Sequence, residues 1–325
     1  MAANLLEVNN LKTYFYTRGG VVKAVDDVTF AMKPGETLGV VGESGCGKSV
    51  TALSVMRLVA NPPGKIIAGE INFNGENILE KSQNELTDIR GSKMSMIFQD
   101  PMTSLNPVFS VGYQIAETVK RHRKDVSNDQ SWRRAVEMLD LVRIPDAKKR
   151  AKSYPHEFSG GMRQRVMIAI ALACNPQLLI ADEPTTALDV TIQAQVLELM
   201  KGLSQEFGTA VMMITHDLGV VAGTCQNVNV MYAGHIVESA PVKQIFQTPA
   251  HPYTIGLLQS IPRVDEVRGS RLTPIAGQPP DLTNPPAGCP YAARCPRVQN
   301  RCRQERPELM SVGRGQQVAA CFYPN

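Results

Sequence analysis

Gly42-Glu43-Ser44-Gly45-Cys46-Gly47-Lys48-Ser49 is the stretch of this 325-residue sequence that decides its fold. It fits the pattern G-x-x-x-x-G-K-[ST], and it lies between an apolar run at 37–41, typical of a buried strand, and an expected helix from about 48 to 59. Glycines let backbone amides turn toward phosphate oxygens, and the helix N-terminus adds positive potential. The loop therefore predicts ATP and Mg²⁺ as cofactors, with Lys48 reaching the β- and γ-phosphates and Ser49 ligating the metal. The residues expected to contact the nucleotide are Gly42, Ser44, Gly45, Cys46, Gly47, Lys48 and Ser49.

Strand and helix signals alternate on both sides of this loop. Between about 111 and 173 the pattern is helical, with no clear strand, and a further helix is expected at 191–207. Strands alternating with helices indicate a mostly parallel α/β sheet, so the helical stretch is expected to be a separate subdomain. The expected strands are 5–15, 24–32, 37–41, 71–74, 94–98, 178–181, 210–214 and 228–232.

Two carboxylates end one of these expected strands. Leu178-Leu179-Ile180-Ala181 is an apolar run followed directly by Asp182 and Glu183. The end of a buried strand presents such side chains to a bound nucleotide. We expect Asp182 to hold Mg²⁺ and Glu183 to polarise the attacking water, as a general base does in phosphoryl transfer.

The composition changes near Ile261. Residues 262–325 contain nine arginines, no lysine, five acidic residues, ten of the 22 prolines and four of the seven cysteines. The remainder balances 25 basic against 25 acidic residues, which argues against a nucleic-acid surface. No stretch approaches the roughly 18 uninterrupted apolar residues of a membrane helix. Residues 1–10 lack a basic stretch followed by an apolar block, so we expect a cytosolic chain.

A third motif indicates the family. Phe158-Ser159-Gly160-Gly161-Met162-Arg163-Gln164-Arg165 precedes a helical run at 166–173. Here the chain resembles the ABC transporter ATPases, whose signature motif is S-G-G at the start of a helix. Met162 stands where many members have Gln, a substitution typical of peptide-importer members. Ser159 and the amides of Gly160 and Gly161 are expected to cap a helix whose N-terminus can grip a phosphate.

The resemblance implies a fold and further site residues. The fold is α/β, a P-loop RecA-like core with an antiparallel β subdomain, an inserted all-helical subdomain at about 105–173 and a Pro- and Cys-rich C-terminal extension. The domains are then 1–261, the nucleotide-binding domain, and 262–325, the extension. Gln99 matches the loop glutamine that links Mg²⁺ and the attacking water to the helical subdomain, and His216 matches the histidine that contacts the γ-phosphate. The loop at 186–189 also matches, with Thr186 replacing the usual Ser.

An aromatic side chain from the first strand is expected to stack on the adenine. Tyr14, Phe15 and Tyr16 are consecutive, and strand alternation puts Phe15 on the opposite face from its two neighbours. The spacing of the family favours Phe15, and a shift of one residue in register moves the assignment to Tyr14 or Tyr16.

The resemblance also implies partners. Two ATPase subunits, identical or homologous, meet head to tail, so that ATP lies between the phosphate loop of one and the Ser159 region of the other. Closing and opening would drive two transmembrane permease subunits, served by an extracytoplasmic solute-binding protein, from the cytoplasmic face of the membrane. The alternative is a soluble ABC ATPase that acts on ribosomes, DNA or iron-sulfur assembly. One phosphate loop and no heptads speak against the ribosomal and repair classes.

The C-terminal third resembles the oligopeptide and dipeptide importer branch. His251-Pro252-Tyr253-Thr254 with Gly256-Leu257-Leu258, then Gly277-Gln278-Pro279-Pro280-Asp281-Leu282 and Gly288-Cys289-Pro290, carry this resemblance. It implies import of di- or oligopeptides, with nickel or another solute as the alternative within the branch.

Four cysteines of the extension, Cys289, Cys295, Cys302 and Cys321, suggest a metal site. A proline-rich segment with so few apolar side chains is expected to need a staple, and disulfides are unfavourable in the cytosol. Zinc sites usually contain C-x₂₋₄-C pairs, whereas these wider gaps, with prolines after two cysteines, favour a [4Fe-4S] cluster. Zinc and unligated thiols stay open. Cys46, beside a helix N-terminus, is expected to have a lowered thiol pKa, the alternative being that it is simply a small residue tolerated in the loop.

Overall fold

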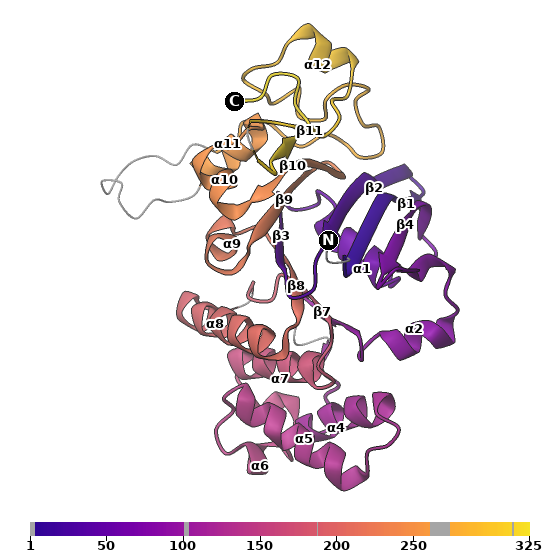
Figure 1. Cartoon of the computed structure of the whole chain (residues 1–325), viewed down its shortest axis with the longest axis vertical. Coiled ribbons are helices and arrows are strands. Elements are labelled where there is room, and N and C mark those ends of the chain that lie inside the picture. Colours follow the sequence, from indigo (N-terminus) through magenta and orange to yellow (C-terminus); the bar gives the residue numbers. More distant parts are fainter. Residues whose placement is uncertain (1–3, 101–103, 187, 261–273, 314) are drawn as a thin grey trace. The chain divides into compact units, whose positions relative to one another are not determined.

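The computed structural model describes residues 4–100, 104–186, 188–260, 274–313 and 315–325 (Figure 1). The chain divides into two compact units. Unit 1 comprises Met1–Met32, Thr37–Leu79 and Thr215–Asn325, and unit 2 comprises Lys33–Glu36 and Glu80–Ile214. The boundary expected at 261/262 falls at the edge of residues outside this description.

Unit 1 contains an antiparallel sheet with the strand order β2-β1-β4-β5. Buried residues alternate with half-buried or exposed ones along the first part of β1, as expected for a strand with one face on a core. Helix α1 packs against that face, where Thr13 Oγ1 and Ser54 Oγ lie 2.8 Å apart. The elements are β1 (Leu6–Thr17), β2 (Gly20–Met32), β4 (Gly64–Phe73), β5 (Glu76–Asn77) and α1 (Lys48–Val55).

The remaining strands of unit 1 follow the order β11-β12-β10-β9-β3. Strand β3 (Thr37–Val41) pairs in parallel with β9 (Asn227–Tyr232), and β10 (His235–Pro241) pairs antiparallel with β9. Strand β3 runs into the phosphate loop and α1, as the sequence predicts. Helix α1 ends at Val55 rather than near 59, because Arg57 adopts a left-handed backbone with φ of 50°.

The extension packs onto unit 1. Its strand β12 (Val318–Ala319) pairs antiparallel with β10, and β11 (Met310–Ser311) pairs with β12. Tyr291, 2% exposed, contacts the rings of Tyr232 and Tyr253 at centroid distances of 5.3 and 5.4 Å. Unit 1 also contains the short helices α9 (Leu218–Thr224), α10 (Val242–Gln247) and α11 (Pro252–Gln259), and the extension contains α12 (Asn300–Gln304). The extension is therefore ordered by a shared core, which its own composition does not reveal.

Unit 2 contains three parallel strands in the order β8-β7-β6. These are β6 (Met94–Ile97), β7 (Leu178–Asp182) and β8 (Ala210–Thr215), whose last residue belongs to unit 1. Every residue of β7 and β8 is buried, which explains their continuous apolar sequences. The expected α/β architecture with an antiparallel sheet is confirmed.

Helices fill the rest of unit 2. The helical stretch expected between 111 and 173 is divided into four α-helices and a 3₁₀ helix (Pro155–Glu157), and the three longer α-helices begin at side-chain caps. Ser110, Ser127 and Ser159 each accept a hydrogen bond from a backbone N–H of the first turn. The helices are α2 (Gln83–Ile89), α4 (Val111–His122), α5 (Asn128–Leu141), α6 (Ala147–Arg150), α7 (Gly160–Leu172) and α8 (Val190–Phe207).

Candidate functional site

The phosphate loop of unit 1 is shaped by close backbone packing. A Cβ atom added to Gly42 would lie 2.2 Å from the carbonyl oxygen of Met231, and one added to Gly47 would lie 2.3 Å from that of Ala24. Both glycines also have positive φ, 153° and 108°. Only glycine fits at either position.

The middle of the loop is open. Ser44 and Gly45 are exposed, Gly45 has φ of 77°, and no atom lies within 4 Å of a Cβ added there. An anion can therefore approach the backbone at Gly45 without meeting a side chain, as a phosphate cradle requires. This arrangement fits a nucleotide phosphate.

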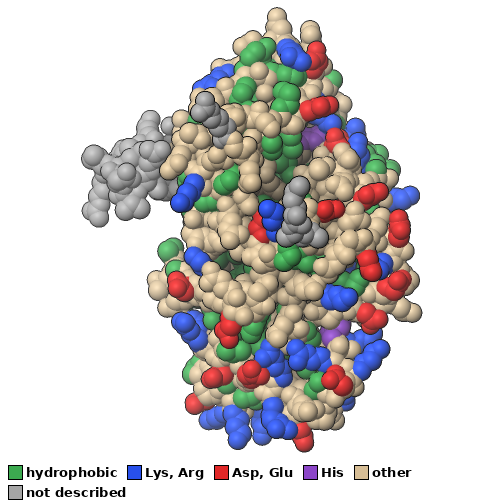
Figure 2. Space-filling model, in the orientation of Figure 1, with side chains coloured by type: hydrophobic (Ala, Val, Ile, Leu, Met, Phe, Trp, Pro, Cys, Tyr) green, Lys and Arg blue, Asp and Glu red, His purple; other side chains and the backbone are tan. Residues whose placement is uncertain are grey.

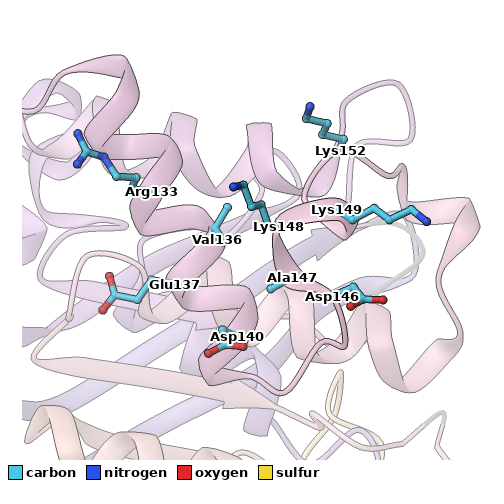
Figure 3. A pocket seen from close by; sticks show the side chains of 9 residues that line it. All are labelled: Arg133, Val136, Glu137, Asp140, Asp146, Ala147, Lys148, Lys149 and Lys152. Carbon is cyan, nitrogen blue, oxygen red and sulfur yellow. The ribbon is translucent and has the colours of Figure 1, made fainter.

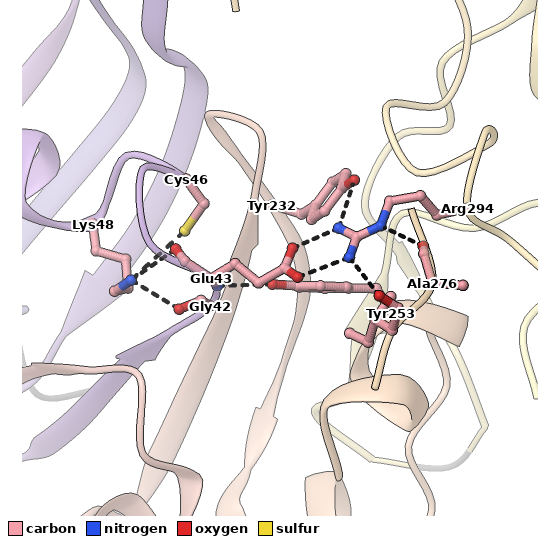
Figure 4. Close-up of polar contacts among 9 residues, drawn as sticks. Gly42, Glu43, Cys46, Lys48, Tyr232, Tyr253, Ala276 and Arg294 are labelled. Atoms are coloured by element: carbon pink, nitrogen blue, oxygen red, sulfur yellow. Dashed lines mark hydrogen bonds and ion pairs between the residues drawn. The ribbon is translucent and has the colours of Figure 1, made fainter. Parts of the chain in front are cut away.

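Lys48 is folded back over the loop. Its side chain is buried, and Nζ donates hydrogen bonds to the carbonyl oxygens of Gly42, at 2.8 Å, and Glu43, at 2.9 Å (Figure 4). The ammonium group is thus held at the loop, where an arriving phosphate can exchange for a carbonyl oxygen. Ser49, half-buried, is the second residue of α1, and His216 is exposed directly after β8.

The expectation for Cys46 is wrong. Cys46 is 5% exposed, and burial raises the pKa of its thiol, although the nearby Lys48 ammonium acts in the opposite direction. Desolvation of the thiolate outweighs the positive potential of the helix terminus. Cys46 is therefore a packed thiol and not an activated one.

The three consecutive aromatic residues differ in their surroundings. Tyr14 donates a hydrogen bond to Asp26 Oδ1 at 2.8 Å, and burial together with this bond raises the pKa of Tyr14 to about 12. Phe15 is half-buried, with its ring close to Gly64, and Tyr16 is 53% exposed. The choice among the three for adenine stacking stays a prediction.

Unit 2 places Gln99 and Glu183 together. Glu183 follows β7 with φ of 45°, and its backbone N–H donates to the carbonyl oxygen of Ile214 at 2.9 Å. Gln99 Nε2 and Thr186 Oγ1 both donate to Glu183 Oε2, at 3.1 and 2.8 Å. Asp182, the last residue of β7, is 6% exposed. Two donors therefore restrain one oxygen of the Glu183 carboxylate.

The signature residues lie at the N-terminus of α7. Ser159 Oγ accepts from the backbone N–H of Met162 at 3.3 Å, and Ser159 and Gly160 are exposed. A Cβ added to Gly161 would lie 2.6 Å from Ile192 Cγ2, so glycine at this position lets α7 approach α8. The motif therefore presents an accessible helix terminus suited to an anion.

A residue that the sequence did not identify touches the phosphate loop. Arg294 of the extension forms two hydrogen-bonded contacts with the carboxylate of Glu43, at 2.6 and 2.9 Å (Figure 4). The hydroxyl of Tyr253 accepts from the backbone N–H of Glu43 at 2.9 Å. No short sequence pattern predicts the contact between Glu43 and Arg294, because the two residues are 251 positions apart in the chain.

The four cysteines of the extension line one cavity, together with His251 and Tyr291. All four are free thiols, and burial raises the pKa of Cys289 to about 11 and that of Cys295 and Cys321 above the usual value. Within the described residues, no three His, Cys, Asp or Glu side chains are arranged to hold a metal ion.

A second hollow, of about 920 Å³, lies in unit 2 among α5, α6 and the residues that follow (Figure 3). It contains none of the residues predicted to bind nucleotide or metal. Figure 2 shows basic side chains gathered at the lower end of the view, where Figure 1 places α5 and α6. The side chains that line the hollow are those of Arg133, Val136, Glu137, Asp140, Asp146, Ala147, Lys148, Lys149 and Lys152.

The phosphate loop, the carboxylate pair after β7 and the serine-capped α7 together define an ATPase of the ABC class. A model of the ABC transporter family matches residues 25–186, and a model of the oligopeptide/dipeptide transporter C-terminal region matches residues 237–302. In the part of the chain that the structure describes, no helix is long and apolar enough to cross a membrane.

Known proteins resemble the chain over nearly its full length. The probable peptide ABC transporter ATP-binding protein y4tR of Sinorhizobium fredii is 55% identical over 99% of this chain and 95% of its own. The oligopeptide transport ATP-binding protein OppD of Salmonella typhimurium is 53% identical, covering 98% and 94%. The solved dimeric cassette MJ0796, bound to ADP and Pi, has a TM-score of 0.65 at 27% identity and covers 73% of this chain and 98% of its own. The chain belongs to the family of ATP-binding proteins of oligopeptide/dipeptide ABC transporters.

Because the backbone at Gly45 is open to an anion, a side chain placed there should weaken the binding of ATP more than a side chain placed at a comparable glycine outside the loop. Gly75, in the turn before β5, has φ of 79° and likewise no atom within 4 Å of an added Cβ. Gly45→Ala and Gly75→Ala should each lower the free energy of unfolding by about 1 kcal/mol, because both place a side chain in left-handed backbone. Only Gly45→Ala should weaken binding of a fluorescent ATP analogue, by about 10-fold or more. Equal affinities in the two variants would contradict the cradle.

Proposed function

We propose that the chain is the ATP-hydrolysing motor subunit of an importer that takes up di- or oligopeptides across the cytoplasmic membrane, and that it works at the cytoplasmic face of that membrane. The assignment of peptides as the cargo rests on the match of residues 237–302 to the oligopeptide/dipeptide transporter C-terminal region. Relatives named for oligopeptide and dipeptide transport support it.

ATP binds first at the phosphate loop. The backbone amides around Gly45 and the ammonium of Lys48 bind its phosphates, and Phe15 stacks on the adenine. Ser49, Gln99 and Asp182 offer the oxygen atoms that Mg²⁺ prefers. When bound, the ion supplies positive charge that offsets the charge on the phosphates.

The residue that activates the attacking water is Glu183, which follows β7. Glu183 accepts a proton from the attacking water, and Gln99 and Thr186 hold the carboxylate through hydrogen bonds to the same oxygen. His216 contacts the γ-phosphate. Because different residues accept the proton, hold the carboxylate and contact the γ-phosphate, a single substitution can remove one of these functions at a time.

The working form is a head-to-tail dimer. Ser159 and Gly160 form an exposed cap of a 13-residue helix, available to the γ-phosphate of ATP bound to a second ATPase subunit. A relative with a solved structure is described as a dimeric cassette. Loss of the γ-phosphate removes contacts made only in the closed dimer, so hydrolysis opens it.

Glu183→Gln tests the motor. The amide keeps the size of the side chain but cannot accept the proton, so the variant should bind ATP, lose at least about 100-fold in turnover and accumulate the ATP-bound dimer in size-exclusion chromatography. Glu117→Gln, at an exposed position on α4, is the matched control and should keep full turnover. In cells, Glu183→Gln should abolish uptake of a labelled tripeptide and leave nickel uptake unchanged. Unchanged turnover refutes the role of Glu183, and lost nickel uptake refutes the peptide cargo.

The partners are two membrane permease subunits, which the opening and closing of the ATPase dimer would drive, and an extracytoplasmic solute-binding protein that delivers the cargo to them.

Unit 2 exposes an apolar surface formed by Val108, Phe109 and Tyr113, which are 69%, 42% and 46% exposed. The two rings are stacked, with centroids 4.9 Å apart. Exposed apolar clusters of this kind are typical of protein contacts. We assign this surface to a cytoplasmic segment of a permease.

Replacing both rings tests this assignment. Phe109→Ser with Tyr113→Ser should remove the stimulation of ATP hydrolysis by the reconstituted permease pair, because the apolar contact area is lost, and should leave the affinity for ATP unchanged. Tyr154→Ser is the control, since Tyr154 is also 42% exposed in unit 2 and stacks on His156. Full stimulation in the double variant would exclude the surface.

The four thiols of the extension fit a metal-bound cluster by their chemistry. They line one cavity, and none forms a disulfide. Four thiolates suit either Zn²⁺ or an iron-sulfur cluster, and the wide spacing of these cysteines, without C-x₂₋₄-C pairs, favours a [4Fe-4S] cluster over zinc. The cluster would supply a covalent staple for the extension.

Metal analysis tests the cluster. Anaerobically purified protein should contain about four iron and four sulfide per chain. Cys295→Ser should lower both contents by at least half, because it removes one of the four ligands. Cys174→Ser and Cys225→Ser, outside the extension, should leave them unchanged. Stoichiometric zinc without iron would overturn the assignment.

A further inference from the structure

Arg294 of the extension makes a two-pronged ion pair with the phosphate loop. Its Nη1 lies 2.6 Å from Glu43 Oε2, and its Nη2 lies 2.9 Å from Glu43 Oε1. The side chain of Arg294 is 4% exposed and that of Glu43 is 28% exposed. A guanidinium that meets both oxygens of a carboxylate fixes the orientation of both groups.

The guanidinium is itself held from several sides. It donates to the hydroxyl of Tyr232 at 3.2 Å and to the carbonyl oxygens of Ile275 and Ala276 at 3.2 and 3.0 Å. The hydrogen bonds to Glu43, partly opposed by desolvation, raise the pKa of Arg294 above its usual value. Arg294 therefore provides a rigid support for Glu43.

Glu43 is fixed at three points. Its carboxylate meets Arg294, its backbone N–H donates to the hydroxyl of Tyr253 at 2.9 Å, and its carbonyl oxygen accepts from Lys48 Nζ at 2.9 Å (Figure 4). The next two residues, Ser44 and Gly45, are the exposed part of the cradle. Fixing Glu43 thus fixes the start of the segment that must surround the phosphates.

The ion pair also has an electrostatic effect. Glu43 carries a negative charge next to the open part of a loop that binds an anion, and like charges repel. The guanidinium offsets that charge where water screens it poorly. Order and charge compensation both lower the free-energy cost of binding a phosphate.

We propose that Arg294 is a positioning residue for nucleotide binding, which holds Glu43 in place and compensates its charge so that the phosphate loop is preformed. This rests on the phosphate loop being the nucleotide site. The extension then contributes directly to the affinity for ATP.

The first test compares two arginines of the extension. Arg294→Ala should raise KM for ATP and the dissociation constant of a fluorescent ATP analogue by about 10-fold, with kcat changed less than about twofold, because it removes support from the loop and not from the carboxylate after β7. Arg303→Ala, at an exposed position of the extension, should change none of these. Wild-type affinity in folded Arg294→Ala overturns the proposal.

The second test separates charge compensation from support of the loop. Adding Glu43→Gln to Arg294→Ala should restore part of the lost affinity, because the uncompensated charge is removed while the support by Arg294 stays lost, and no restoration would exclude charge compensation. Arg294→Lys keeps the charge without the two-pronged contact and should give an intermediate affinity; if Arg294→Ala does not fold, this variant decides, and wild-type affinity in it counts against the proposal. Lys48→Ala should abolish binding. Intact binding in Lys48→Ala would refute the nucleotide site itself, whereas lost binding there with full binding in Arg294→Ala refutes only the role of Arg294.

Discussion

The close packing of the phosphate-loop backbone is the constraint on which unit 1 depends. Gly42 and Gly47 lie against the carbonyl oxygens of Met231 and Ala24, where no side chain fits. These contacts fix the loop between β3 and α1 and leave Gly45 open to an anion. The same crowding buries Cys46, which is why its thiol is not activated.

The extension is an integral part of unit 1. Strand β12 continues the sheet through β10, and Tyr291 packs with Tyr232 and Tyr253. Glu238, fully buried, accepts from the backbone N–H groups of Ala250 and His251 and from Gln317 Nε2 of the extension. Apolar and polar contacts therefore order a segment that cannot build a core of its own.

The sequence predicted those parts of the fold and of the candidate site that depend on a few consecutive residues. The phosphate loop, the strand before Asp182 and the serine cap at Ser159 each depend on a short pattern, and the structure places strands and helices there. The bonds of Gln99 to Glu183 and of Arg294 to Glu43 join residues 84 and 251 positions apart. No periodicity encodes such pairs, because only the folded chain brings them together. The pKa of Cys46 was misjudged for a related reason, since burial is a property of the fold.

One short segment of the extension connects the thiols to the phosphate loop. Cys289 and Cys295 flank Tyr291 and Arg294, so residues that line the cysteine cavity and the one that reaches Glu43 lie within seven positions of each other. If the two sites are coupled through this segment, the coupling is reciprocal, so nucleotide bound at the loop would stabilise the cysteine site by the same free energy. The segment that holds Arg294 at Glu43 is thus the same one that carries two of the four thiols.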